Sequence, residues 1–485
     1  MSGGDVKKTG SGTKDARKAA FNVLNRVFGA DAYADIVLER EARGLKPIDR
    51  TLCTELVYGV LRWRQRLDWM IDAFSTIKTR KLETKVLNAL RLGLYQTLFL
   101  TKIPASAAVN ESVKLVKGLG MKRAGFVNAV LRKASSSGSG AGVKFPDFEK
   151  DPVGHISIFY SHPRWMVKRW VERYGAAEAL DICRTDNTAP PRTLRVNTLL
   201  CTRPALLSEL REAGFEARET RYSPWGIVIT GGGFLPPADK KFYIQDEASQ
   251  LVPLLLGPGP GESVLDACAA PGGKSTQMAA MMENSGVIYA VDKHMERLKR
   301  VKGAAGRLGA GIIKTIHVDA GEPGFLCESA GPGRPEDETV GMVYAGPGKP
   351  GFLKGEGEKE FDAILVDAPC SGLGVLRRSP DIKIRRMEKD IRDLSERQKR
   401  LLDNISGYLK KGGRIVYSVC TLEPEETDGA VEWFLARHGE FSLEGADSFF
   451  TGGLKGLVDK DGFLRTLPHR HGTDGFFAAR LVKRR

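Results

Sequence analysis

Two segments of this 485-residue chain each place a cysteine directly after a short run of β-forming residues. Ala363–Val366 leads into Asp367-Ala-Pro-Cys370-Ser-Gly, and Arg414–Val419 leads into Cys420 and Thr421. In open α/β sheets, ligands bind just beyond the carboxyl ends of the parallel strands. A thiolate held there is a strong nucleophile. We therefore predict that Cys370 and Cys420 meet across one pocket beside Asp367. The alternative is that both are small buried structural residues.

A second group of residues has the types and spacing of a nucleoside pocket. Residues 263–274 run from a strand through the small-residue turn Cys268-Ala269-Ala270-Pro271-Gly272-Gly273 into a helix that begins near Lys274. Glycines let a ligand approach the backbone, and a helix N-terminus offers unpaired N–H groups. The strands Val287–Val291 and Ile312–Val318 then end in Asp292 and Asp319. These carboxylates suit ribose hydroxyls and an adenine amino group. A lone Asp after a strand is usually a helix cap, but the three features together predict a nucleoside cofactor.

Both groups require an α/β sheet, and the rest of the chain divides around it. Apolar residues recur at helical spacing from Asp15 onward, and no strand pattern is found before about residue 155. The Gly321–Glu360 stretch holds ten Gly and five Pro, which is typical of a mobile insertion. The predicted segments are a disordered tail (1–14), an all-helical domain (15–134), a Gly/Ser linker (135–145), a small α+β module (146–250) and an α/β domain (251–485) with a flexible insertion (321–360).

The charge balance favours a polyanionic partner. The chain has 74 Lys and Arg against 59 Asp and Glu, a net charge of +15. Basic residues neutralise phosphates and release counterions, so we expect RNA contact, with a solvated basic surface as the alternative. The candidates for RNA contact lie on a predicted strand of the small module and after Cys370: Arg192, Arg195, Asn197, Arg377, Arg378 and Lys383.

Other classes of protein are disfavoured by the same sequence. No apolar run approaches the ~18 residues that span a bilayer, and the first residues lack the core of a signal peptide. The seven cysteines include no CxxC pair, which argues against disulfides and against a metal site. We expect a soluble cytoplasmic protein with reduced thiols, a monomer without a metal.

Four stretches carry a resemblance to a known family. They are DACAAPGGK, VDAPCSGLGVLRRSPDIK, YSVCTLEPEE and the terminal DGFFAARL. They resemble, in order and over nearly the whole chain, the RNA cytosine-5 methyltransferases that act on bacterial 16S ribosomal RNA. Residues 15–134 resemble the NusB-type helical RNA-binding domain of that family. The resemblance implies a Rossmann-like class I methyltransferase domain with a mostly parallel seven-stranded sheet.

The resemblance also implies a role for each candidate residue. Residues 268–274 and Asp292, Asp319 and Asp367 would hold S-adenosylmethionine, with Asp367 also reaching the cytosine. Cys420 would attack C6 of the base, and Cys370 would assist release of the product. The implied substrate is a cytosine in 16S ribosomal RNA or in a small-subunit assembly intermediate, exposed from its stack.

Two alternatives remain open at this point. One is a related cytosine-5 methyltransferase that acts on transfer RNA or on another ribosomal position. The other is a non-catalytic RNA-binding ribosome-assembly factor, which the paired Cys370 and Cys420 disfavour.

Overall fold

The computed structural model describes residues 15–30, 32–137, 142–232, 238–323, 325, 342–344, 360–450 and 456–484. The predicted disordered tail (1–14), part of the predicted linker and most of the predicted insertion (321–360) lie outside these residues. The chain forms two compact units. The first runs up to Thr188 and also includes Leu376–Arg385, and the second comprises Ala189–Val375 and residues from Arg386 onward.

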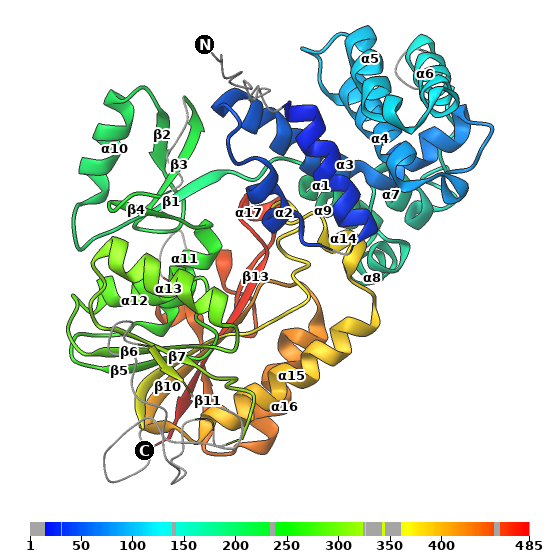
Figure 1. The fold of residues 1–485 in the computed structure, drawn as a ribbon. Helices are drawn as coiled ribbons and strands as arrows, with labels where there is room; N and C mark the ends of the chain where they lie inside the picture. The colour runs from blue at the N-terminus through cyan, green and yellow to red at the C-terminus, as the bar shows by residue number, and fades with distance from the viewer. Residues whose placement is uncertain are drawn as a thin grey trace, which may run out of the picture. The chain divides into compact units, whose positions relative to one another are not determined.

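The first unit is helical among its described residues and carries the blue to cyan helices of Figure 1. Its first helix shows how the sequence produces the unit. Asp15 caps the helix by accepting a hydrogen bond from Arg17 N (2.9 Å), and Val23, Leu24 and Val27 form a buried stripe. The helices are α1 (Ala16–Gly29), α2 (Ala34–Glu41), α3 (Pro47–Phe74), α4 (Thr84–Phe99), α5 (Ala105–Val116), α6 (Met121–Ser136), α7 (Pro152–Phe159), α8 (Arg164–Tyr174), α9 (Ala176–Asp186) and α14 (Ile382–Arg385).

The second unit begins with a small antiparallel sheet in the order β2-β3-β1-β4. Its strands are β1 (Arg192–Val196), β2 (Glu216–Glu219), β3 (Gly226–Gly231) and β4 (Phe242–Ile244), and helix α10 (Arg203–Glu212) packs on it. Because β1 lies between β3 and β4, four of its five residues are buried.

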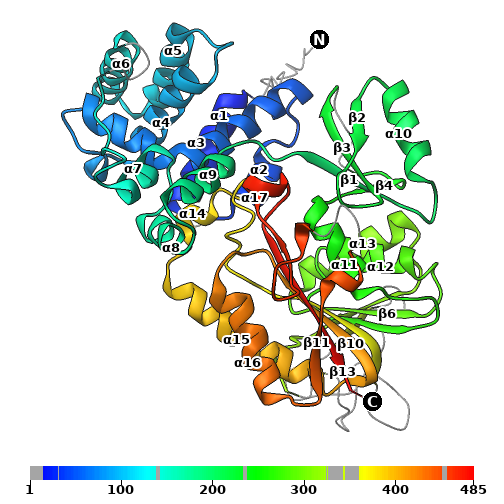
Figure 2. The same ribbon diagram turned by 180° about the vertical axis from the view of Figure 1, so that it is seen from behind.

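The main sheet of the second unit has the order β11-β13-β10-β9-β5-β6-β7-β8, with β12 paired to β13. From β10 to β8 every neighbouring pair is parallel, whereas β13 runs antiparallel to β10, β11 and β12. Figure 2 shows the red β13 beside β10 and β11. The strands are β5 (Ser263–Asp266), β6 (Val287–Asp292), β7 (Ile313–His317), β8 (Met342–Tyr344), β9 (Phe361–Asp367), β10 (Leu409–Val419), β11 (Phe441–Glu444), β12 (Leu464–Thr466) and β13 (Phe476–Lys483).

The predicted mixed α/β architecture is confirmed, but the sheet is larger than the seven strands expected. Its nine strands in the described part include short ones, such as β8 and β12 with three residues each, that carry too little pattern to be read from sequence. The helices of this domain are α11 (Glu247–Leu256), α12 (Gly273–Met281), α13 (Met295–Leu308), α15 (Lys389–Ser406), α16 (Asp428–Arg437) and α17 (Pro468–His471).

Strand β9 explains why its sequence is a continuous apolar run. Ala363 and Leu365 pack into the core on the face that holds α11 and α12, while Ile364 and Val366 pack into the core on the face that holds α15 and α16. A strand covered on both faces has no exposed side on which polar residues could alternate. The parallel register pairs Asp367 with Ser418 and brings the ends of β9 and β10 to one rim. No helix in the described part of the chain is long and apolar enough to cross a membrane.

Candidate active site

The structure brings the two predicted thiols together. Cys420 follows directly on β10, and Cys370 lies three residues beyond the end of β9. Ala368 N donates to Ser418 O (2.9 Å), which continues the parallel pairing past the last residue of β9. The Sγ atoms of Cys370 and Cys420 lie 3.1 Å apart, a hydrogen-bond contact in which either thiol can donate. Both side chains are half-buried, so each retains some access to solvent.

The surroundings of Cys370 disfavour its thiolate form. The hydrogen bond with Cys420, burial and the nearby Cys420 and Glu426 all raise the pKa of Cys370 well above its ordinary value. Cys370 is therefore a neutral S–H group at neutral pH and is suited to donate toward the sulfur of Cys420.

The loop that carries Cys370 is fastened to a buried glutamate. Glu426, at the end of the short 3-10 turn Pro424–Glu426, accepts a hydrogen bond from Ser371 N (2.8 Å) and another from Gln398 Nε2 (2.9 Å). Gln398 also donates to Pro369 O (2.9 Å). The Tyr417 hydroxyl contacts both Gln398 Oε1 (3.1 Å) and Glu426 O (2.6 Å). Burial raises the pKa of Glu426.

Three further contacts hold the same loop. Arg386 donates from Nε to Ser371 O (3.0 Å) and from a terminal nitrogen to Cys370 O (3.2 Å). The hydroxyls of Ser371 and Thr421 lie 2.7 Å apart and join the residues that follow the two cysteines. The segment 369–371 is thus bound on its amide and carbonyl sides by side chains from α15, the 3-10 turn and Arg386.

Asp367 links the thiol loops to the predicted cofactor loop. Its Oδ1 accepts from Ser418 Oγ (2.8 Å), and its Oδ2 pairs with Lys274 Nζ (2.6 Å) on the first turn of α12. The side chain of Asp367 remains about a third exposed, with a relative exposure of 31%. This carboxylate can therefore contact a ligand while it is held from two sides.

The small-residue turn passes over the ends of β5 and β6. Ala269 N donates to Val291 O (2.8 Å), and Gly272 N donates to Ala269 O (2.8 Å). Gly272 has a φ of +101° and forms the N-cap of α12, and a Cβ there would lie 3.0 Å from Val301 Cα. Glycine is therefore required both by the left-handed backbone and by the packing of α12 on α13.

Asp292 and Asp319 lie at the ends of neighbouring strands, as predicted from the sequence pattern. Asp292 Oδ1 accepts from His294 N (2.8 Å), and Asp319 Oδ1 accepts from Gly321 N (3.0 Å), so each carboxylate is oriented by its own turn. Oδ2 of Asp319 has cations nearby, Arg397 at 3.5 Å and Lys293 at 3.8 Å. Arg297 lies 3.9 Å from Oδ2 of Asp292.

Asp266, at the end of β5, is a buried carboxyl beneath the cofactor turn. It accepts from Ser275 Oγ (2.6 Å) on α12. Burial raises the pKa of Asp266 to about 7. Burial also raises the pKa of the Cys268 thiol, with Asp266, Asp292 and Asp367 adding to the effect. Cys268 is thus a neutral thiol.

Several predicted RNA contacts prove to be internal. Arg195 is 2% exposed, and its guanidinium donates to Gln245 Oε1 (2.7 Å), Thr276 Oγ1 (3.0 Å) and Gly273 O, so it supports the first turn of α12. Asn197 is also buried and donates to Lys240 O (2.8 Å) and Leu308 O (2.9 Å). Arg192, at the start of β1, is exposed.

The basic residues after Cys370 belong to the helical unit. Lys383 is 4% exposed and donates to Asn187 Oδ1 (2.7 Å), and burial lowers its pKa. The side chain of Arg377 is buried as well, and that of Arg378 is half-buried. We therefore do not assign Arg195, Asn197, Arg377 or Lys383 to an RNA-binding surface. The burial of these basic residues could not be predicted, because sequence alone does not show which elements cover a strand or loop.

Three residues of this rim were missed by sequence reasoning: Glu426, Gln398 and Asp266. A weak signal existed for Glu426, which closes the YSVCTLEPEE stretch, and for Asp266, which precedes the small-residue turn. Gln398 gives no signal, because it lies on the amphipathic helix α15 among many charged residues.

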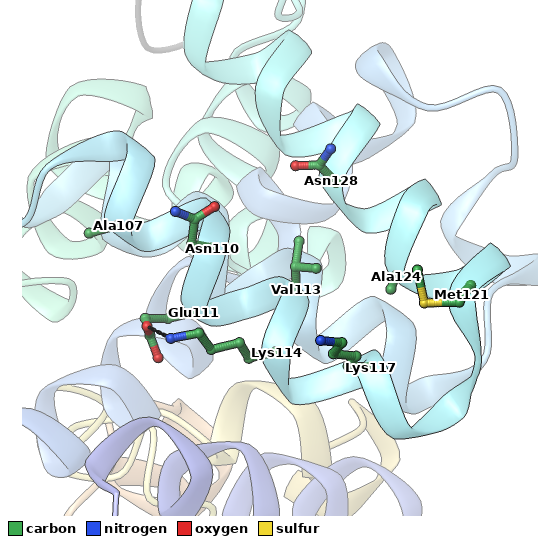
Figure 3. A pocket seen from close by; sticks show the side chains of 9 residues that line it. All are labelled: Ala107, Asn110, Glu111, Val113, Lys114, Lys117, Met121, Ala124 and Asn128. Carbon is green, nitrogen blue, oxygen red and sulfur yellow. Dashed lines mark hydrogen bonds and ion pairs between the residues drawn. The ribbon is translucent and has the colours of Figure 1, made fainter.

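A cavity of about 450 Å³ lies in the helical unit between α5 and α6, and Figure 3 shows its lining. Asn110 and Asn128 face it from the two helices, and Glu111 pairs with Lys114 at its edge (2.6 Å). None of the residues predicted from the sequence lines it. Among the described residues, no group of three or more His, Cys, Asp or Glu side chains is arranged to hold a metal ion.

The strand order, the acidic strand ends and the paired thiols define the class of the second unit as a Rossmann-like methyltransferase domain. Residues 253–482 match the family described as 16S rRNA methyltransferase RsmB/F. Residues 14–136 match the NusB family, and residues 162–233 match the ferredoxin-like domain of RsmF/B-like methyltransferases.

Similar proteins span the whole chain. A probable ribosomal RNA small subunit methyltransferase B of Bacillus subtilis is 36% identical, over 99% of this chain and 100% of that protein. A protein of the same description from Synechocystis is 34% identical, over 96% of this chain and 99% of that protein. The solved structure titled PH0851 is 26% identical with a TM-score of 0.73, and the match covers 96% of this chain and 99% of that one. The chain therefore belongs to the RsmB/F family of S-adenosylmethionine-dependent ribosomal RNA methyltransferases, and the predicted NusB-like domain is confirmed.

Proposed function

We propose that this protein methylates C5 of a cytosine in 16S ribosomal RNA, with S-adenosylmethionine as the methyl donor and a covalent bond between Cys420 and C6 of the base as the intermediate. The observation that carries the proposal is the pair of thiols 3.1 Å apart at the ends of β9 and β10. The names of the relatives, ribosomal RNA small subunit methyltransferase B, support ribosomal RNA as the substrate class.

The residues of the cofactor rim fit S-adenosylmethionine by their chemistry. Asp292 and Asp319 present carboxylate oxygens that accept hydrogen bonds from ribose hydroxyls and from an adenine amino group. The residues Cys268, Ala269, Ala270, Pro271, Gly272, Gly273 and Lys274 would enclose the rest of the cofactor, and Asp367 would face its cationic end. When bound, this cofactor supplies a methyl group on a positively charged sulfur, which is the electrophile that the reaction requires.

Cys420 performs the first covalent step. C5 of cytosine is too weak a nucleophile to take a methyl group unaided. The Cys420 thiolate forms a bond to C6, and the electrons of the C5–C6 double bond then make C5 an enamine-like nucleophile.

Cys370 acts when the product leaves. A base removes the C5 proton, the electrons of that C–H bond restore the C5–C6 double bond, and the C6–Sγ pair returns to Cys420 as a thiolate. A hydrogen bond from Cys370 stabilises this leaving thiolate, so we assign product release to Cys370. The base reaches these atoms only when it is out of its stack, and we expect an unpaired or flipped cytosine.

RNA contacts in this proposal are limited to basic residues with solvent access. Arg192 is exposed on β1, and Arg378 is half-exposed in the segment that follows Cys370. The excess of basic residues in the whole chain supports a phosphate-binding surface beyond these two positions.

Bisulfite sequencing tests the proposal. Unmethylated 16S RNA is incubated with S-adenosylmethionine and the protein, with Cys420→Ala as the control and transfer RNA as a second substrate. One protected cytosine in 16S RNA, absent with the control variant, is the expected result. Protection only in transfer RNA would identify a different substrate, and unchanged cytosines in both RNAs would contradict the reaction.

A further inference from the structure

We propose that Glu426 is a positioning residue that holds the Cys370 loop in place for product release, an inference that rests on the two-thiol reaction proposed above. Glu426 accepts hydrogen bonds from Ser371 N (2.8 Å) and from Gln398 Nε2 (2.9 Å). Ser371 is the residue after Cys370, so this carboxyl group fixes the peptide that carries the releasing thiol.

Burial shields the hydrogen bond between Glu426 and the Ser371 amide from water. Glu426 is 0% exposed, and water does not compete for its oxygens. Gln398 extends the contact because it donates to Pro369 O (2.9 Å) on the other side of Cys370. Loss of the acceptor would leave the Ser371 amide without its partner, and an unsatisfied buried amide drives the backbone to rearrange.

The two thiols differ in what holds them. Cys420 directly follows β10, whose last residue, Val419, is paired with Phe477 of β13, and Cys420 O accepts from Gly374 N (3.0 Å). Cys370 lies beyond the last paired residue of β9, and the segment around it is held by the side chains of Glu426, Gln398 and Arg386. Removal of Glu426 therefore displaces Cys370 more than Cys420.

This asymmetry predicts which step fails. The nucleophile remains in place, so attack on C6 and methylation of C5 proceed. In the elimination, the C6–Sγ electron pair must return to Cys420 while Cys370 donates its hydrogen bond, and a displaced Cys370 no longer does so. Displacement of a reacting group by about 1 Å slows a step by up to about a hundredfold. The methylated covalent adduct should therefore accumulate.

The experiment follows adduct formation and decay in a single turnover with radiolabelled S-adenosylmethionine and 16S RNA, resolved on a denaturing gel. Glu426→Ala should form the adduct at a rate near that of wild type and release the methylated RNA at least about tenfold more slowly. Glu426→Asp keeps the carboxyl group but withdraws the acceptor from Ser371 N, and it should also stall. Glu426→Gln keeps an acceptor oxygen and should release at nearly the wild-type rate.

Two further variants serve as controls, one for normal release and one for complete stalling. Glu425→Gln removes a carboxylate from the same 3-10 turn without touching the acceptor of Ser371 N, and it should release normally. Cys370→Ala provides the full extent of stalling. If Cys370→Ala forms no adduct, the division of labour between the thiols fails.

The outcomes distinguish a failure of the role of Glu426 from a failure of the two-thiol reaction on which that role depends. If Cys370→Ala stalls but Glu426→Asp releases like wild type, only the role of Glu426 fails. If Glu426→Gln stalls as strongly as Cys370→Ala, an acceptor oxygen in the right place is not sufficient, the charge or proton of the carboxyl group is required, and the positioning role is overturned. Glu426→Asp and Glu426→Gln decide the question even if Glu426→Ala does not fold.

Discussion

The rim at the carboxyl ends of the parallel strands has two halves. The cofactor half contains residues 268–274, Asp292 and Asp319, and the thiol half contains Cys370 and Cys420. The two halves position their functional groups by different means. In the cofactor half, Asp292 and Asp319 are oriented by amides two residues further along the chain. In the thiol half, Cys370 is held through Glu426, which lies 55 residues from its partner Ser371. Each half also rests on a buried carboxyl group, Asp266 beneath the cofactor turn and Glu426 beneath the Cys370 loop.

The two halves require different precision in the placement of their groups. A cofactor bound through several hydrogen bonds tolerates small shifts at any one of them, because the remaining contacts keep it in place. In the proposed reaction, Cys370 must donate a hydrogen bond to the sulfur of Cys420, 3.1 Å away, and no second contact replaces that one. Distant side chains therefore secure the Cys370 loop, and changes in the two halves should have distinct effects.

The largest effect is expected from the nucleophile itself. Cys420→Ser should lower methyl transfer by at least about a thousandfold, because a hydroxyl does not ionise at neutral pH as a thiol does. Binding of S-adenosylmethionine should be unchanged, since the cofactor half is untouched. Rates of methyl incorporation and calorimetric titration measure the two effects. Cys201→Ala, at a half-buried thiol next to the small sheet, is the control and should keep full activity.

A smaller effect is expected in the cofactor half. Asp292→Ala removes the predicted acceptor of the ribose hydroxyls and should weaken binding of S-adenosylmethionine about tenfold to a hundredfold, since hydrogen bonds to a charged group are worth about 1.5–3 kcal/mol. Isothermal titration calorimetry measures the change. Glu296→Gln, an exposed carboxylate on α13, should bind normally. Equal affinities for the wild type and Asp292→Ala would remove Asp292 from the cofactor site.

The smallest effect concerns stability and pH. Burial raises the pKa of Asp266 from 3.8 to about 7 in the folded protein. Folding therefore favours the protonated form, and the stability that this group contributes is full below about pH 3.8 and lost as the pH rises through about 7. Asp266→Asn does not titrate and should gain stability relative to wild type over this window, by at most about 1.4 kcal/mol per pH unit.

Urea unfolding of the wild type and of Asp266→Asn at several pH values between 4.5 and 7.5 measures whether the difference in the free energy of unfolding grows in favour of Asp266→Asn as the pH rises. Asp461→Asn, at an exposed carboxylate of the same domain, is the control for the loss of a surface carboxylate. A constant difference for Asp266→Asn would show that Asp266 is not held in its protonated form.

In both halves, the sequence predicted the residues at the strand ends and missed the side chains that support them. Asp292 and Asp319 follow apolar runs, and the proximity of Cys370 and Cys420 follows from two parallel strands. These are local patterns. The partners of Glu426 and the burial of Arg195 and Lys383 depend on which distant elements pack together, and no periodicity within a single segment encodes that. Basic residues in particular were assigned to RNA because charge is visible in sequence and burial is not.

We propose that Cys420 forms the covalent bond to RNA and that Cys370 allows this bond to break. Cys370→Ala is incubated with S-adenosylmethionine and 16S RNA, the adduct is isolated under denaturing conditions, and the RNA-linked peptide is identified by mass spectrometry. We predict a methylated cytosine attached to the peptide that contains Cys420, and no adduct in the double variant Cys370→Ala, Cys420→Ala. RNA attached to any other residue, or normal release of methylated RNA by Cys370→Ala, would contradict the claim.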